Sequence, residues 1–223
     1  RMLDHPKSQR FVRNFIRVWL ELDNIGRMPP SPDFRNYYRD DLGNAMQIET
    51  EHFFSHLLHQ NLPLKEFLTA NFSFLNRELA KHYGISGIEG SHFRKVTLPH
   101  STRGGILGHG SFLTASANGV DTSPVIRGIY VMNKLLDYTP PPPPDDVPEI
   151  EPDVRGTITL RQQLIKHRAD PSCAQCHDKI DPAGFALENY DAIGSWRDQY
   201  PDKLPVDALS LIHISEPTRQ SPI

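Results

Sequence analysis

Apolar residues recur at helical spacing along the first 84 residues of the chain. The first stripe lies in an Arg-rich segment and consists of Phe11, Phe15, Val18, Trp19 and Leu22. A Ser31-Pro32 helix-start signal precedes a longer stripe, which predicts a helix reaching about residue 60. Its buried positions are expected at Met46, Phe53, Phe54, Leu57 and Leu58. Shorter helices are predicted at 64–68 and 74–82, the second capped by Ser73 and ended by Gly84.

Glycine and proline become frequent in the middle of the chain, where the helical pattern weakens. A short helix is expected near 106–117, and Ser123-Pro124 starts a stronger helix that runs through Leu135. Five consecutive prolines, 140–144, predict a stiff polyproline II spacer of about 15 Å, at ~3.1 Å per residue. A capping box at 159–162 and an Asp170-Pro171 start signal predict two further helices. The pattern therefore predicts a mainly α fold without a sizeable sheet.

Composition narrows the class of protein. The chain has 223 residues, of which 38% are hydrophobic and 23% charged, as expected for a globular protein. A net charge of −3 gives no reason to expect nucleic acid or an acidic membrane surface as a partner. No run of apolar residues is long enough to predict a transmembrane segment. The chain opens without an initiator Met or an apolar leader, so we interpret it as the interior of a longer protein.

Both cysteines stand near the C-terminal end, in the stretch HRADPSCAQCHDKIDPAGF. On a helix turning roughly 100° per residue, Cys173 and Cys176 lie about 60° apart, and His177 lies about 40° from Cys173. Two thiols on one face can add to the two vinyl groups of a haem while the imidazole binds its iron. This spacing is the attachment pattern of c-type haem. We predict covalent haem c on the two cysteines, with His177 as the proximal iron ligand.

The same motif has three other uses in proteins. A thioredoxin-type redox pair needs a preceding strand, and here a helix is predicted. A structural zinc site needs four ligands, which His177 and His167 would have to complete. A disulfide between cysteines three residues apart closes so small a loop that it stabilises little. Haem attachment is favoured over all three.

The same stretch resembles a known family. Residues 167–196 resemble the haem-binding C-terminal domain of multidomain planctomycete-type cytochrome c proteins. The segment RGGILGHGSFLTASANGVDTSPVIRGIYVMNKLL with PPPPPDDVP is similar to the domain before it in that family. The first 84 residues, ending FLNRELAKHYGI, look like the end of the preceding helical domain. The resemblance implies a large secreted or envelope-associated haem protein, whose other domains are the expected partners, and it implies no particular reaction.

Pattern and resemblance together divide the chain into five segments. Residues 1–88 are expected to be the C-terminal part of a helical domain, and 89–139 a short helical middle domain. Residues 140–153 form the Pro-rich linker and 154–208 a truncated, small α-helical, cytochrome c-like haem domain. The tail 209–223 contains the string SLIHISEPTRQSPI, which resembles translated sequencing-adapter read-through. We therefore interpret this tail as foreign to the protein.

The second axial ligand decides between two functions. No methionine follows position 132, so the ligand has to come from upstream, from the rest of the parent chain, or be absent. His109 and Met132 are the upstream candidates, although a turn histidine and a core methionine are simpler interpretations of them. A six-coordinate iron predicts an electron carrier, whereas an open iron predicts a peroxidase-like redox enzyme. We favour an open or weakly ligated iron in this chain, because the proline spacer separates the two segments.

The expected function is electron transfer outside the cytoplasm, in the periplasm or at the cell surface, because c-type haem is attached on that side of the membrane. The redox partner is not identified by the sequence. The alternatives are the open-site enzyme and a non-redox surface or scaffold module, in which the cysteines bind zinc or form a disulfide.

Two further groups of residues are candidates for sites. The stretch ETEHFFSHLLHQ contains two spacings that can bind a metal on a helix, His52 with His56 and Glu49 with His52. A solvated polar face is nevertheless the favoured interpretation of Glu49, His52, His56 and His59. After the cysteines, Asp181-Pro182 is predicted to end the helix and return the chain over the haem. The apolar walls of the haem pocket are expected to be Phe185, Leu187, Tyr190 and Trp196.

Overall fold

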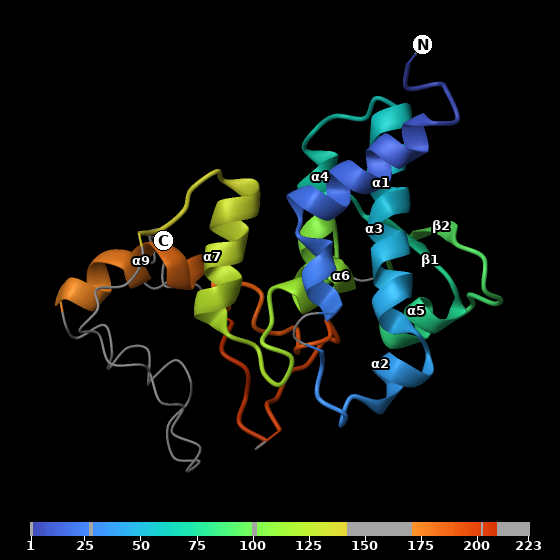
Figure 1. Ribbon diagram of the computed structural model, residues 1–223. Coiled ribbons are helices and arrows are strands. Elements are labelled where there is room, and N and C mark those ends of the chain that lie inside the picture. The colour runs from blue at the N-terminus through green and yellow to red at the C-terminus, as the bar shows by residue number, and fades with distance from the viewer. Residues whose placement is uncertain (1, 27–28, 100–101, 142–170, 202, 209–223) are drawn as a thin grey trace, which may run out of the picture. The chain divides into compact units, whose positions relative to one another are not determined.

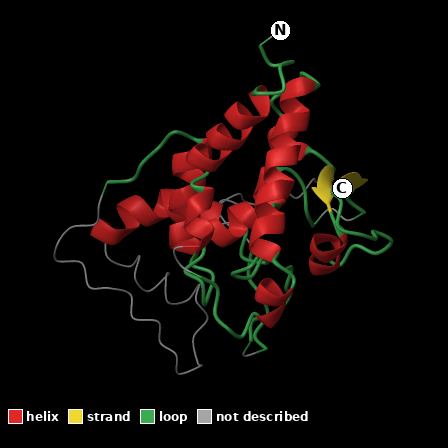
Figure 2. Ribbon diagram, turned by 45° about the vertical axis from the view of Figure 1, so that its right-hand side comes forward, coloured by secondary structure: helices red, strands yellow, loops and turns green. Residues whose placement is uncertain are grey.

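A computed structural model describes residues 2–26, 29–99, 102–141, 171–201 and 203–208 (Figure 1). Helices predominate in these ranges, and the one sheet found there has two strands (Figure 2). The predicted mainly α fold is therefore confirmed. Most of the proline spacer, the helix predicted from the capping box, His167, Asp170 and the tail lie outside the described residues.

The chain forms two compact units. The first comprises residues 1–122 and 190–196, and the second comprises 123–189 and 197–223. This division differs from the predicted boundaries at 88 and 139. Strand pairing joins the segments on either side of residue 88, and the apolar residues of the following helices are buried in the first unit. Local composition does not reveal such long-range contacts, which is why the boundaries differ.

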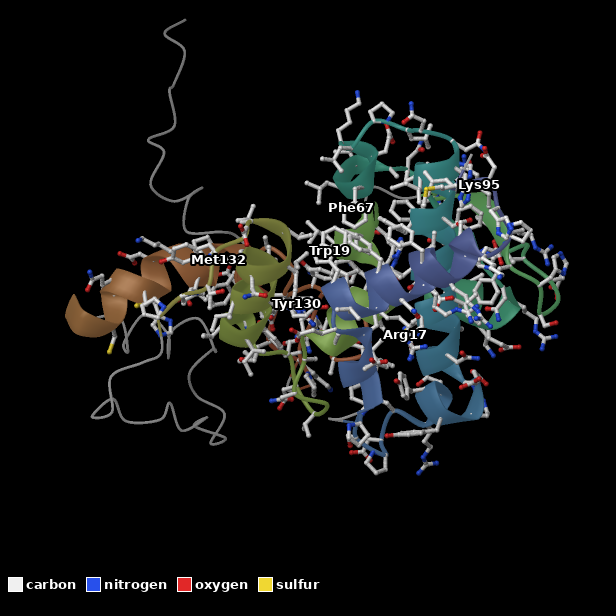
Figure 3. All side chains as sticks on the ribbon, turned by 45° about the horizontal axis from the view of Figure 1, so that its top comes forward. Arg17, Trp19, Phe67, Lys95, Tyr130 and Met132 are labelled. Carbon is white, nitrogen blue, oxygen red and sulfur yellow. The ribbon has the colours of Figure 1, made fainter. Side chains whose placement is uncertain are left out.

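The first unit contains most of the described elements. In chain order they are α1 (Ser8–Trp19), η1 (Leu22–Gly26), α2 (Arg35–Arg39), α3 (Leu42–His59), α4 (Glu66–Thr69), β1 (Phe72–Leu75), α5 (Arg77–His82), β2 (Arg94–Thr97), η2 (Ile106–Gly108) and α6 (Gly110–Ala115). The strands pair antiparallel, with Phe72 opposite Thr97. Trp19 of α1 stacks on Phe67 of α4, with ring centroids 5.1 Å apart (Figure 3). Aromatic packing thus joins the helices around α3.

Three predictions about the first unit are wrong in detail. The buried face of α1 is formed by Val12 and Ile16, whereas Phe11 and Val18 are exposed. Ser31 shapes a turn, because its hydroxyl accepts a hydrogen bond from the amide of Asp33, and the long helix is divided into α2 and α3. Phe74 and Leu75, which were predicted to begin a helix, belong instead to β1.

Ser73 is not a helix cap but a buried member of β1. The cap of α5 is Asn76, whose side chain accepts a hydrogen bond from the Leu79 amide at 2.9 Å. The predicted end of this helix is confirmed, since Gly84 has the positive φ of 71° that favours glycine.

Within the described residues of the second unit, the helices are α7 (Pro124–Leu135) and α9 (Pro171–Phe185), which lie side by side (Figure 1). Ser123 caps α7 as predicted, accepting a hydrogen bond from the Ile126 amide. The predicted break at Asp181-Pro182 is wrong, because α9 continues through Pro182 to Phe185. Among the described helices, none is both long and apolar enough to cross a membrane.

Candidate functional site

The helix α9 carries the complete Cys-x-x-Cys-His motif. Cys173, Cys176 and His177 are all partly exposed, and the two thiols are not joined in a disulfide. Helical geometry therefore places two reduced thiols and one imidazole on the same accessible face. This is the donor set that covalent haem attachment requires.

The imidazole of His177 is fixed by a carboxylate one turn further along α9. Its Nδ1 lies 2.9 Å from Oδ1 of Asp181, whose side chain is completely buried. The His177 side chain is 14% exposed to solvent. Because Nδ1 is engaged, Nε2 is the ring nitrogen that would bind iron, so the residues present fit the proximal side of a haem.

Close packing against α7 holds this part of α9 in place. A Cβ on Gly184 would lie 1.7 Å from the Pro124 carbonyl oxygen, and one on Gly128 would lie 2.2 Å from that of Ile180. The backbones of the two helices therefore touch at both glycines. The buried guanidinium of Arg127 adds a hydrogen bond of 2.9 Å to the Leu187 carbonyl, which follows the end of α9.

The two candidates for the second axial ligand lie in different units. Met132 is buried in α7, within the unit that contains α9 (Figure 3). His109 is buried in the first unit, where its Nδ1 lies 2.9 Å from the Thr50 hydroxyl and its Nε2 lies 3.5 Å from that of Ser73. Both ring nitrogens of His109 thus face hydroxyl groups, and iron binding would have to displace one of them.

The predicted pocket walls are divided between the two units. Phe185 and Leu187 are buried in the second unit, whereas Tyr190 and Trp196 belong to the first. There their rings meet edge to face, with centroids 5.3 Å apart. They line a small pocket together with side chains from the segment that follows α5 and from the loop around position 100. The other lining residues are Tyr83, Ile85, Leu98, Pro99, Thr102 and Arg103.

The His-rich stretch of α3 has no metal-binding arrangement. His52 stacks on Phe74, His56 lies 3.0 Å from the Lys95 ammonium, and His59 contacts the Ser55 carbonyl. Across the part of the chain that the structure describes, no three His, Cys, Asp or Glu side chains converge as metal ligands. The zinc interpretation of the cysteines therefore finds no supporting ligand set within the described ranges.

Glu49 of the same helix is not on a solvated face, as the sequence favoured, but completely buried. Its carboxyl accepts hydrogen bonds from Ser73 at 2.5 Å and Tyr83 at 2.6 Å. Burial raises the pKa of Glu49 from 4.5 to about 7, although both hydrogen bonds oppose the shift. Burial also lowers the pKa of the neighbouring His109 from 6.5 to about 3, with Arg103 contributing in the same direction.

These two groups have opposite effects on the pH dependence of stability. Glu49 keeps a proton on folding, so its contribution falls as the pH rises from about 4.5 to 7. His109 loses a proton on folding, so its contribution rises with pH from about 3 to 6.5. Between about pH 4.5 and 6.5 the two slopes cancel. The cluster therefore contributes little net slope in that window.

Glu49→Gln is expected to reveal the pH dependence that His109 gives to the free energy of unfolding, because it removes the opposing contribution of Glu49. Relative to wild type, the free energy of unfolding of the variant should rise by about 1 kcal/mol per pH unit between pH 4.5 and 6.5. His109→Gln should give the opposite slope over the same range. Urea unfolding at several pH values measures both. Two variants that keep the wild-type pH profile would contradict the assignment of these protons.

Two family models match the chain. Residues 1–85 match PSD4, a protein family of unknown function (DUF1592), and residues 103–200 match PSCyt3, a protein family of unknown function (DUF1588). The chain is similar to both families, in this order. Both are domain families associated with planctomycete cytochrome c proteins. No curated protein and no solved structure matches the chain.

The PSCyt3-like stretch includes both α7 and the cysteine motif of α9. The similarity thus extends over the middle segment and the motif together, which the sequence had assigned to separate domains. The missed residue at this site is Asp181, which was interpreted as a helix breaker. Its spacing from His177, four residues on a helix, is the signal that identifies it as a partner of the imidazole.

Proposed function

We propose that this chain binds haem c covalently through Cys173 and Cys176, with His177 as proximal ligand, and serves electron transfer outside the cytoplasm. The observation that carries the proposal is the donor set of α9, in which two reduced thiols share a face with an imidazole whose Nδ1 is held by Asp181. The similarity to two cytochrome-associated families supports it.

The chemistry of attachment fits these side chains. Each thiol would form a carbon–sulfur bond with one carbon of a vinyl group, while its hydrogen passes to the other vinyl carbon. The addition needs no external oxidant or reductant. When bound, the haem supplies one-electron chemistry at its iron. Since c-type attachment takes place outside the cytoplasmic membrane, the proposal includes export of the parent protein.

A second candidate is an open-site haem enzyme that binds a peroxide or another small oxidant. The observation in its favour is that His109 is buried with the Thr50 and Ser73 hydroxyls at its two ring nitrogens, so iron binding would displace one of these contacts. Met132 is then the remaining upstream candidate. The two functions differ in whether the iron has a sixth protein ligand.

Carbon monoxide binding distinguishes them. The open-site enzyme predicts that the reduced, haem-loaded protein binds carbon monoxide rapidly and completely, because an open iron offers no competing side chain. His109→Ala should leave the rate unchanged. Wild-type protein that refuses carbon monoxide, with binding restored by Met132→Ala, would identify Met132 as the ligand and establish the electron carrier over the enzyme.

A further inference from the structure

We propose that Asp181 is a positioning residue that makes His177 a strong electron donor to the iron and thereby lowers the midpoint potential of the haem. The inference rests on the proposed function and specifies how the protein tunes the group that it binds. It assigns a role to a buried acidic side chain that attachment itself does not use.

The contact has the geometry of a strong, fixed hydrogen bond. Nδ1 of His177 and Oδ1 of Asp181 are 2.9 Å apart, and the carboxyl group is shielded from water by complete burial. A carboxylate accepts hydrogen bonds, so the proton of a neutral imidazole lies on Nδ1. The lone pair of the ring is then on Nε2, where a metal binds.

The protein holds this pair rigidly in place. Ile180, directly before Asp181, has its carbonyl against Gly128 of α7, and Gly184, three residues after it, lies against the Pro124 carbonyl. Both contacts are between backbones, so this turn of α9 has little room to shift. The imidazole is therefore oriented by a carboxylate whose own position is set by helix packing.

The consequence for a bound haem is electronic. A buried negative charge at Nδ1 gives the imidazole more anionic character and a stronger bond to iron, as carboxylate partners do for metal-bound histidines. A more basic ligand stabilises the ferric state over the ferrous state, so the potential falls. A histidine bonded to a neutral carbonyl would lack this effect. The expected redox partner is accordingly one of low potential.

The test compares Asp181→Asn with wild type and with Asp178→Asn, an exposed carboxylate of the same helix. In haem-loaded protein, Asp181→Asn should raise the midpoint potential and lower the iron–imidazole stretching frequency of the reduced state. Asp178→Asn should leave both near wild type, because an exposed charge is screened by solvent. Equal shifts in the two variants, or no shift in either, would overturn the proposal.

A second measurement needs neither haem nor substitution. Nitrogen-15 NMR of the haem-free full chain should show His177 protonated at Nδ1, and a neutral ring protonated at Nε2 would overturn the proposal even if Asp181→Asn fails to fold. Absence of haem from matured wild-type protein would instead contradict the proposed function. The two failures are therefore distinguishable.

Discussion

Replacing both Cys173 and Cys176 with serine is expected to abolish covalent haem attachment. A serine hydroxyl does not form the thioether, so haem made available to this variant remains extractable. Each single substitution should leave one possible thioether and reduce the yield of attached haem. His177→Ala should impair attachment as well, because it removes the ligand that holds the iron over the thiols.

Haem staining after denaturing electrophoresis measures this directly, since only covalently bound haem migrates with the chain. The matched control is His92→Ala, which removes an exposed histidine of the first unit and should keep full staining. Staining of the double serine variant at the wild-type level would show that haem is held elsewhere.

Gly184→Ala is expected to unfold the second unit or to weaken it severely. The added methyl group would lie 1.7 Å from the Pro124 carbonyl oxygen, and the obstacle is backbone rather than a mobile side chain. Overpacking costs about 1–3 kcal/mol and occasionally more, and a clash with rigid backbone belongs at the upper end of that range. Gly128→Ala should have a similar effect, because its methyl group would meet the Ile180 carbonyl at 2.2 Å.

Denaturant unfolding, followed by circular dichroism, measures the loss. Ile126→Ala is the control, because it changes an exposed residue of α7 that is 46% accessible. The loss in free energy of unfolding of that variant should be at most a small fraction of the loss in Gly184→Ala. If Gly184→Ala unfolds at the same denaturant concentration as Ile126→Ala, the close approach of α7 and α9 is wrong.

Local signals in the sequence predicted the helices whose ends are locally determined. Ser123-Pro124 provides both a side-chain cap and a preset φ, and α7 begins there. Gly84 ends α5 because glycine adopts a positive φ at low cost. The alignment of Cys173, Cys176 and His177 on one face followed from helical periodicity alone, since it requires only that α9 be a helix.

The errors arose where distant segments override local preference. Strand β1 exists because residues 94–97 pair with it, and its serine donates to Glu49 instead of capping a helix. Helix α9 continues through Pro182 because burial against α7 supports the turn that proline would otherwise end. The burial of Glu49 likewise depends on partners far along the chain, Ser73 and Tyr83, which periodicity in α3 cannot reveal.

Covalent haem attachment is tested most directly by the pyridine haemochrome spectrum of the full chain, produced in a host with c-type maturation. We expect the spectrum of a haem with two thioether bonds, and we expect acid acetone to leave the haem on the polypeptide. A protein without haem, or with haem that acid acetone extracts, would contradict covalent attachment at Cys173 and Cys176.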